Sequence, residues 1–187
     1  PDKPVLYVFD FDETLTIQSK ILQNPINLSD NMFDDQRLDD ILYMFELIRD
    51  SHPLNKIIIL TANIAENVKQ YLSENTVAAT ISAPGKITSA DDPIQDLIKE
   101  IYSHIDGIIG DDVARQIVSS AGGAPQFKYK EMEKMITDTY QGYTIKFFDD
   151  NTDNIDAANK LAATYPSKIE PIHVTNNLLS QFTSSFK

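Results

Sequence analysis

The first residues in this sequence with the means to do chemistry are two acids that follow an apolar run. Residues 5–9 (VLYVF) lead directly into Asp10 and Asp12. Two carboxylates this close repel each other when buried, unless a cation neutralises them. A hard cation with oxygen ligands, Mg²⁺ above all, is the natural partner. The alternative is that Asp10 or Asp12 only caps a turn.

A second acidic pair follows another apolar run. Residues 143–148 (YTIKFF) precede Asp149, Asp150 and Asn151. The carboxyl ends of adjacent parallel strands meet at one edge of a sheet, so this pair is expected to converge with the first. The alternative is that these residues cap the following helix, although capping needs one such residue rather than two acids.

A third run, 57–60, ends in Thr61, Ala62 and Asn63. A hydroxyl group and backbone N–H groups at the start of a helix can bind an anion, so these three are candidate substrate-binding residues. Taken alone the pattern is weak, because Ser and Thr are also common helix N-caps.

A pocket of acids that binds an anion needs a fixed positive charge. Lys128 and Lys130 precede a helical pattern that contains Met132 and Met135. Lys128 lies four and seven residues before these methionines, which places it above the buried face of that helix. Lys130 is offset from that face, and either lysine could instead be a solvated surface residue. We favour Lys128.

Strand and helix patterns alternate along the chain. The expected strands are 5–9, 57–60, 105–109, 143–148 and 172–174, and the expected helices cover about 37–50, 64–72, 93–101, 132–140 and 155–165. This alternation predicts an α/β fold, doubly wound, with a mostly parallel five-stranded sheet and helices on both faces. Residues 16–36, 75–92 and 119–126 read as loops, and 176–187 as a polar tail or part of a longer helix.

Composition limits the classes of function. The chain has 187 residues, which fits a single domain over 1–187, and it has no cysteine, which excludes thiol catalysis and Cys-ligated metals. With 28 acidic against 16 basic residues the net charge is -12, which opposes nucleic-acid binding and contact with anionic membranes. We expect a cytoplasmic or otherwise soluble protein. The first residue is Pro1 rather than Met, so the chain is a candidate piece of a longer one.

These motifs together resemble those of the haloacid dehalogenase superfamily of phosphohydrolases. VFDFDETLT over 8–16 is similar to the family's Asp-x-Asp-x-Thr motif, and IIILT ending at Thr61 is similar to its second motif. Lys128 stands in the place of the third, and FFDDNTDN over 147–154 is similar to the fourth. The DFDETL and FFDDN strings look most like the small magnesium-dependent and protein-directed phosphatases of the family.

The resemblance implies a role for each matching residue of the first motif. Asp10 would attack phosphorus and become an aspartyl-phosphate. Asp12 would protonate the leaving oxygen and then activate water, which requires it to be held protonated by its surroundings or by the bound phosphate. Thr14 would orient the first loop and the substrate.

The other motifs would supply the metal and phosphate contacts. Mg²⁺ would be held by Asp10, the main-chain carbonyl of Asp12, and Asp150. Asp149 and Asn154 would be additional or outer ligands. Thr61, with Ala62 and Asn63, would contact the phosphoryl oxygens, and Lys128 would balance their charge.

Many members of the family carry a cap domain that encloses small substrates. Here the two insertion sites hold only about 16–36 and 75–104, too few residues for a large lid. We therefore expect a phosphatase without a large cap that acts on a bulky substrate such as a phosphorylated protein, with phosphotyrosine as one candidate. A small-metabolite phosphatase or a phosphotransferase is the alternative within the family. A non-catalytic phospho-acceptor or binding module is the alternative outside it.

Overall fold

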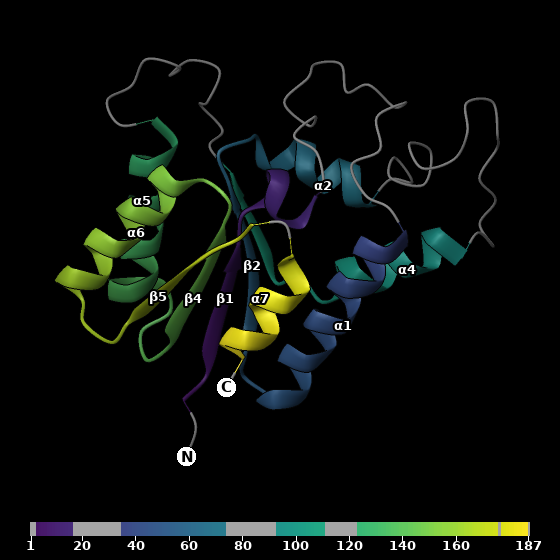
Figure 1. Ribbon diagram of the computed structural model, residues 1–187, viewed down its shortest axis with the longest axis horizontal. Coiled ribbons are helices and arrows are strands. Elements are labelled where there is room, and N and C mark those ends of the chain that lie inside the picture. Colours follow the sequence, from purple (N-terminus) through teal and green to yellow (C-terminus); the bar gives the residue numbers. More distant parts are fainter. Residues whose placement is uncertain (1–2, 17–34, 74–92, 111–122, 176, 187) are drawn as a thin grey trace.

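The computed structural model describes residues 3–16, 35–73, 93–110, 123–175 and 177–186. Its centre is a five-stranded sheet in the order β3-β2-β1-β4-β5, and every neighbouring pair is parallel. The predicted α/β class and its five parallel strands are therefore confirmed (Figure 1). The strands are β1 (Val5–Phe9), β2 (Lys56–Thr61), β3 (Gly107–Gly110), β4 (Thr144–Asp149) and β5 (Ile169–His173).

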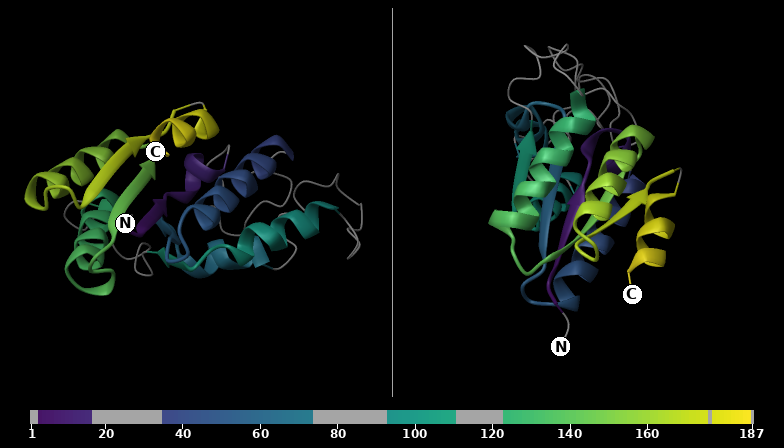
Figure 2. Two further views of the ribbon diagram at one scale, coloured as in Figure 1. Left: turned by 90° about the horizontal axis from the view of Figure 1, so that it is seen from below. Right: turned by 90° about the vertical axis from the view of Figure 1, so that its left-hand side faces the viewer.

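Helices cover both faces of the sheet, as the alternating pattern predicted (Figure 2). One face packs against α1 (Asp35–Ser51), α2 (Ala65–Ser73), α4 (Pro93–Ser103) and α7 (Leu178–Ser185). The other packs against α5 (Gly123–Lys134), the π-helical turn η2 (Met135–Thr139) and α6 (Thr152–Thr164). A short turn, η1 (Phe11–Leu15), directly follows β1, and its Asp12 and Glu13 do not have helical backbone angles.

The central strand shows why the core has two halves. Successive side chains of a strand point to opposite faces. Tyr7 and Phe9 accordingly join the core under α1 and α7, whereas Leu6 and Val8 join the core under α5 and α6. All four are at most 3% exposed, so burial on both faces explains the unbroken apolar run.

The register of β1 sets where the acids meet. Phe9, its last residue, pairs with Ile59 of β2 and with Phe148 of β4. The Asp10 N–H then donates to the Phe148 carbonyl at 2.9 Å, which extends the ladder by one residue. Asp10 therefore leaves the sheet beside Asp149, at the same edge.

Two predicted strands were displaced. The third begins at Gly107 rather than at 105, because the Ile105 N–H still bonds to the Tyr102 carbonyl in the turn that ends α4. The fifth begins at Ile169 rather than at 172. The strand includes Pro171, which is tolerated because β5 is an edge strand, where a missing N–H donor costs little.

Two helical predictions also need correction. Residues 119–126 were expected to be a loop, but α5 begins at Gly123, so Lys128 lies within a helix rather than before one. The stretch 176–187 contains α7, a short helix packed on the sheet rather than a polar tail.

The predicted loops at 16–36 and 75–92 lie largely outside the described residues, and so do the cap insertion sites. The described ranges form this one sheet with its helices. No helix within them combines the length and apolar character needed to cross a membrane.

Truncating Phe182 of α7 tests whether this helix belongs to the core. The ring is fully buried, 5.9 Å from Phe148 and 6.1 Å from Tyr7 between centroids. We predict that Phe182→Ala lowers the free energy of unfolding by about 3 to 5 kcal/mol in urea denaturation. Leu54→Ala, at a side chain that is 56% exposed, is the control and should cost under about 1 kcal/mol. Equal losses in the two variants would show that α7 does not pack on the sheet in solution.

Candidate active site

Two buried ion pairs that share Lys128 form the centre of the site. The Lys128 ammonium, 1% exposed, lies 2.7 Å from Asp10 Oδ1 and 2.7 Å from Asp149 Oδ2. Burial disfavours the charged ammonium, but Asp10 and Asp149 outweigh it and raise the pKa of Lys128. Three elements, β1, β4 and α5, thus deliver one cation and two carboxylates to one point.

Lys130 does not take part, because its side chain is exposed on α5. Of the two lysines considered from the sequence, the structure brings Lys128 to Asp10. The spacing from Met132 and Met135 was a sound guide, since both methionines are buried on the same side of the helix as Lys128.

Thr14 bridges the two acidic segments. Its hydroxyl group lies 3.2 Å from Asp10 Oδ2 and 3.1 Å from Asp150 Oδ1, and it accepts the Asp150 N–H at 3.1 Å. The single hydroxyl hydrogen can go to only one carboxylate at a time. Thr14 is completely buried, so it fixes the η1 turn to the end of β4.

Asp12 has a different environment from Asp10. Burial, followed by repulsion from Asp10, raises the pKa of Asp12 from 3.8 to about 7. Its Oδ1 atom is buried and has no hydrogen-bond partner among the described residues. Burial also raises the pKa of Asp10, but Lys128 opposes it and the result is about 6. Asp12 is therefore the carboxyl more readily kept protonated, and Asp10 the one paired with a cation.

The backbone directly after Asp12 is strained. Glu13 has φ 61° and ψ 7°, in the left-handed region that non-glycine residues seldom adopt. Its N–H donates to Thr16 Oγ1 at 2.9 Å, and the Thr16 N–H donates to the Phe11 carbonyl at 3.1 Å. Such strain persists where the surroundings over-determine the conformation, and it is frequent at functional sites.

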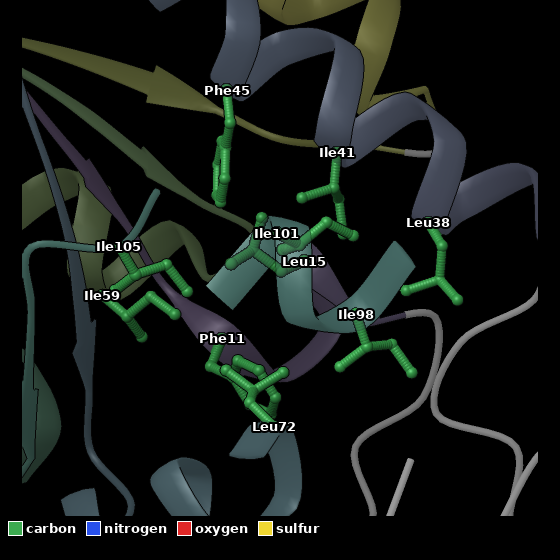
Figure 3. Close-up of a pocket in the computed structure, with 10 residues that line it drawn as sticks. All are labelled: Phe11, Leu15, Leu38, Ile41, Phe45, Ile59, Leu72, Ile98, Ile101 and Ile105. Carbon is green, nitrogen blue, oxygen red and sulfur yellow. The ribbon is translucent and has the colours of Figure 1, made fainter. Parts of the chain in front are cut away.

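Apolar side chains also hold the η1 turn in place. Phe11 and Leu15 flank the Asp12 segment and point into a small, entirely apolar cavity of about 10 Å³ (Figure 3). Leu38 and Ile41 of α1 and Ile98 of α4 are among the residues on its other walls. The apolar lining offers no hydrogen-bond partner to an ordered water, and the packing of Phe11 and Leu15 on these walls anchors η1.

Thr61 and Asn63 lie where the second motif was expected. Both are buried, and Thr61 Oγ1 accepts the Asn63 N–H at 3.0 Å, so Thr61 closes a turn and is not the N-cap of α2, which begins only at Ala65. The Asn63 amide nitrogen is buried without a partner in the described part of the chain. Gly110 packs so closely on this turn that a Cβ would lie 2.4 Å from the Asn63 carbonyl oxygen. Ala62 stands between the two polar residues, only partly buried, in the turn before α2.

The residues after β4 make different contacts. Asn151 is the N-cap of α6, since its side chain accepts the Asp153 N–H at 2.8 Å, so capping does not account for Asp149 or Asp150. Asp149 accepts N–H groups from Lys128, from Asn154 Nδ2 at 3.0 Å and from the Asn151 backbone at 2.9 Å. Asn154 is thereby fixed, while its Oδ1 remains buried without a partner within the described ranges.

The residues present fit a divalent cation. Asp10, Asp149 and Asp150 each offer an oxygen within 4.8 Å of the others. Together with Asp12 they bring four carboxylates toward the one ammonium of Lys128. Oxygen ligands and an excess of negative charge are what Mg²⁺ selects. Because Asp149 is already satisfied by three N–H donors, Asp10 and Asp150 are the better-placed ligands.

Two contacts at this edge were missed from the sequence. His173 ends β5, and its Nε2 lies 2.9 Å from the Asp150 carbonyl, to which it can donate. Inspecting the end of the fifth strand would have found it. Arg37 of α1 contacts the carbonyls of Thr14, Leu15 and Thr16 at the end of η1, which share the two N–H groups of its Nη1 atom. The sequence has no signal for that contact.

Comparison of the chain with models of known families, with curated proteins and with solved structures gave no significant match. The residues of this chain and the way the fold assembles them are therefore the basis for its function.

Replacing Asp12 with Asn tests whether the buried Asp12 carboxyl group is protonated in the folded protein. The pKa of Asp12 is about 7 in the folded protein and 3.8 in the unfolded chain. As pH rises between these values, the unfolded chain ionises while the folded protein keeps the proton, so the free energy of unfolding falls. Asn imitates the protonated acid at every pH. In EDTA, Asp12→Asn should therefore match the wild type near pH 4 and exceed it at pH 8, by roughly 1 to 3 kcal/mol of unfolding free energy.

The control for this comparison is Asp156→Asn, at an exposed position of α6. It should show no such growth of stability with pH. A difference between Asp12→Asn and wild type that is constant from pH 4 to pH 8 would contradict the assigned environment.

Proposed function

We propose that this protein is a Mg²⁺-dependent phosphatase that hydrolyses a phosphomonoester through an aspartyl-phosphate on Asp10. The observation that carries the proposal is the buried Lys128 bridge between Asp10 and Asp149, with Thr14 joining Asp10 to Asp150. It puts a nucleophile, a fixed cation and a second acidic segment at the carboxyl edge of one parallel sheet. The resemblance to haloacid dehalogenase phosphohydrolases assigns the same residues to the same roles.

Asp10 and Asp150 would hold Mg²⁺ with the main-chain carbonyl of Asp12, and Asp149 would lie next to it. When bound, the ion supplies positive charge to the carboxylates and to the phosphoryl oxygens. Lys128 adds a second positive charge on the other side of Asp10. A pocket inside a protein of net charge -12 can thus attract a phosphate, because surface charges beyond about 8 Å are screened at physiological salt.

In the first step an Asp10 carboxylate oxygen bonds to phosphorus, and the bond from phosphorus to the leaving oxygen breaks. Asp12 gives its proton to that leaving oxygen, which departs as an alcohol or phenol. The pKa of Asp12, raised to about 7 by burial, keeps a large protonated fraction near neutral pH. Lys128 and the Thr61 hydroxyl group stabilise the charge on the phosphoryl oxygens.

In the second step a water attacks the phosphorus of the aspartyl-phosphate. Asp12, now ionised, accepts a proton from this water. The bond between phosphorus and Asp10 breaks, which restores the Asp10 carboxylate and releases phosphate. An alcohol in place of the water would give a phosphotransferase, so product analysis decides between the two.

We propose a bulky substrate, a phosphorylated side chain of a protein, with phosphotyrosine among the candidates. The support is the shortness of the two segments at which related phosphatases insert a cap, 16–36 and 75–104, which hold too few residues for a large lid. A lid that excludes water is what favours small metabolites in enclosed sites. The acidic surface makes nucleic acid a poor substrate.

Replacing Asp10 with Asn should abolish turnover of p-nitrophenyl phosphate. Without the nucleophile we predict a loss in kcat of at least about 1,000-fold in steady-state assays with Mg²⁺. Asp153→Asn, an exposed acid of the same edge, is the matched control and should keep wild-type kcat. Asp150→Asn should raise the Mg²⁺ concentration for half-maximal rate at least about tenfold. Undiminished turnover in Asp10→Asn, or phosphorylation of the wild type without turnover, would overturn the proposal, the latter in favour of a phospho-acceptor module.

A substrate panel tests the choice of a protein substrate. Phosphotyrosine, phosphoserine and phosphothreonine peptides are compared with sugar phosphates and nucleotides by kcat/KM, using released phosphate as the readout. We predict the highest values for a phosphopeptide. A clear preference for a sugar phosphate or nucleotide would make this a small-metabolite phosphatase.

A further inference from the structure

Arg37 makes an unusual set of contacts close to the site. It lies in the first turn of α1, and its Nη1 atom is 3.1 Å from the Thr14 carbonyl, 3.2 Å from that of Leu15 and 3.3 Å from that of Thr16. Asp12 and Glu13 do not have helical backbone angles, and the η1 turn is closed by the bond from the Thr16 N–H to the Phe11 carbonyl. An arginine is well suited to bind the carbonyls at the end of such a turn. Arg37 thus joins the end of η1 to α1 across 21 to 23 residues of sequence.

The carbonyls that Arg37 binds belong to the segment that shapes the site. Thr14 accepts from Arg37 through its backbone, while its side chain contacts both Asp10 and Asp150. Thr16 accepts from Arg37 and also from the N–H of Glu13, the residue with the left-handed backbone that follows Asp12. A displacement of these carbonyls would therefore move the hydroxyl group that joins the two acidic segments and the turn that aims Asp12.

We propose that Arg37 is a positioning residue for proton transfer by Asp12. It does not touch the reacting atoms; it holds the strained turn from Asp12 to Thr16 in the one conformation that directs the Asp12 carboxyl group toward the leaving oxygen. Phe11 and Leu15 hold the turn against the apolar core, and Arg37 holds the carbonyl groups at its end. This inference rests on the proposed phosphatase function.

The same helix offers a matched control. Arg49, near the other end of α1, also donates to backbone carbonyls, those of Asn55 and His104, and pairs with Asp106. These partners precede β2 and β3, at the edge of the sheet opposite the site. Arg37→Met and Arg49→Met therefore remove comparable contacts at the two edges, and only the first should alter the chemistry.

The first arm of the test compares leaving groups. Phenyl phosphate needs a proton on its leaving oxygen, because a phenol has a pKa of about 10, whereas p-nitrophenol leaves readily without one. The value of kcat/KM reports the step that forms phospho-Asp10. We expect Arg37→Met to lower kcat/KM for phenyl phosphate by about 10- to 100-fold, and that for p-nitrophenyl phosphate much less. Arg49→Met should leave the ratio of the two values unchanged.

The second arm does not depend on activity. Hydrogen exchange of the Glu13, Thr16 and Asp150 amides, each bonded within this network, should become faster in Arg37→Met and not in Arg49→Met. Should Arg37→Met fold poorly in urea titrations, Arg37→Lys replaces it; Lys keeps the charge but lacks the planar fork, so a smaller change of the same sign is expected.

An equal fall of kcat/KM on both substrates, or unchanged exchange at the three amides, overturns the role of Arg37. A wild type without turnover would overturn the phosphatase function instead, and the exchange arm still decides whether Arg37 holds the turn.

Discussion

A buried ammonium between two carboxylates is the interaction on which the rest of this structure depends. Lys128 is almost fully buried, and removing one member of such a group leaves an uncompensated charge inside the protein. The same contact ties α5 to the ends of β1 and β4. Lys128 brings one positive charge to the carboxyl groups of Asp10, Asp149 and Asp150, so the edge retains an excess of negative charge that suits it to a divalent cation.

The strand order and register bring these acidic residues together. With β1 in the centre and β4 beside it, parallel pairing through Phe9 and Phe148 places Asp10 and Asp149 side by side. The apolar residues before them are buried on both faces, so the acids cannot slide into the sheet without exposing a phenylalanine. Thr14 then closes the arrangement with a hydroxyl group that both acidic segments share.

Much of this was open to prediction because it is encoded by local pattern. The apolar runs located β1, β2 and β4 to within a residue or so, and the acids after them marked the edge where they meet. The choice of Lys128 over Lys130 followed from helical spacing. Predictions failed where tertiary context overrides local signals: Pro171 sits in a strand because that strand is an edge, and α7 is helical because Phe182 is buried against Tyr7 and Phe148. The carbonyl contacts of Arg37 depend on the approach of α1 to η1, which no spacing in the sequence expresses.

The most direct measurement is to trap the covalent intermediate. The protein is mixed with Mg²⁺ and p-nitrophenyl phosphate, quenched in acid within the first turnover, digested, and analysed by mass spectrometry for an acid-stable, hydroxylamine-sensitive phosphoryl group. The account predicts that this group is on Asp10, that EDTA abolishes it, and that none forms on Asp12. Turnover without any acyl-phosphate, or a phosphoryl group on a residue outside this cluster, would contradict it.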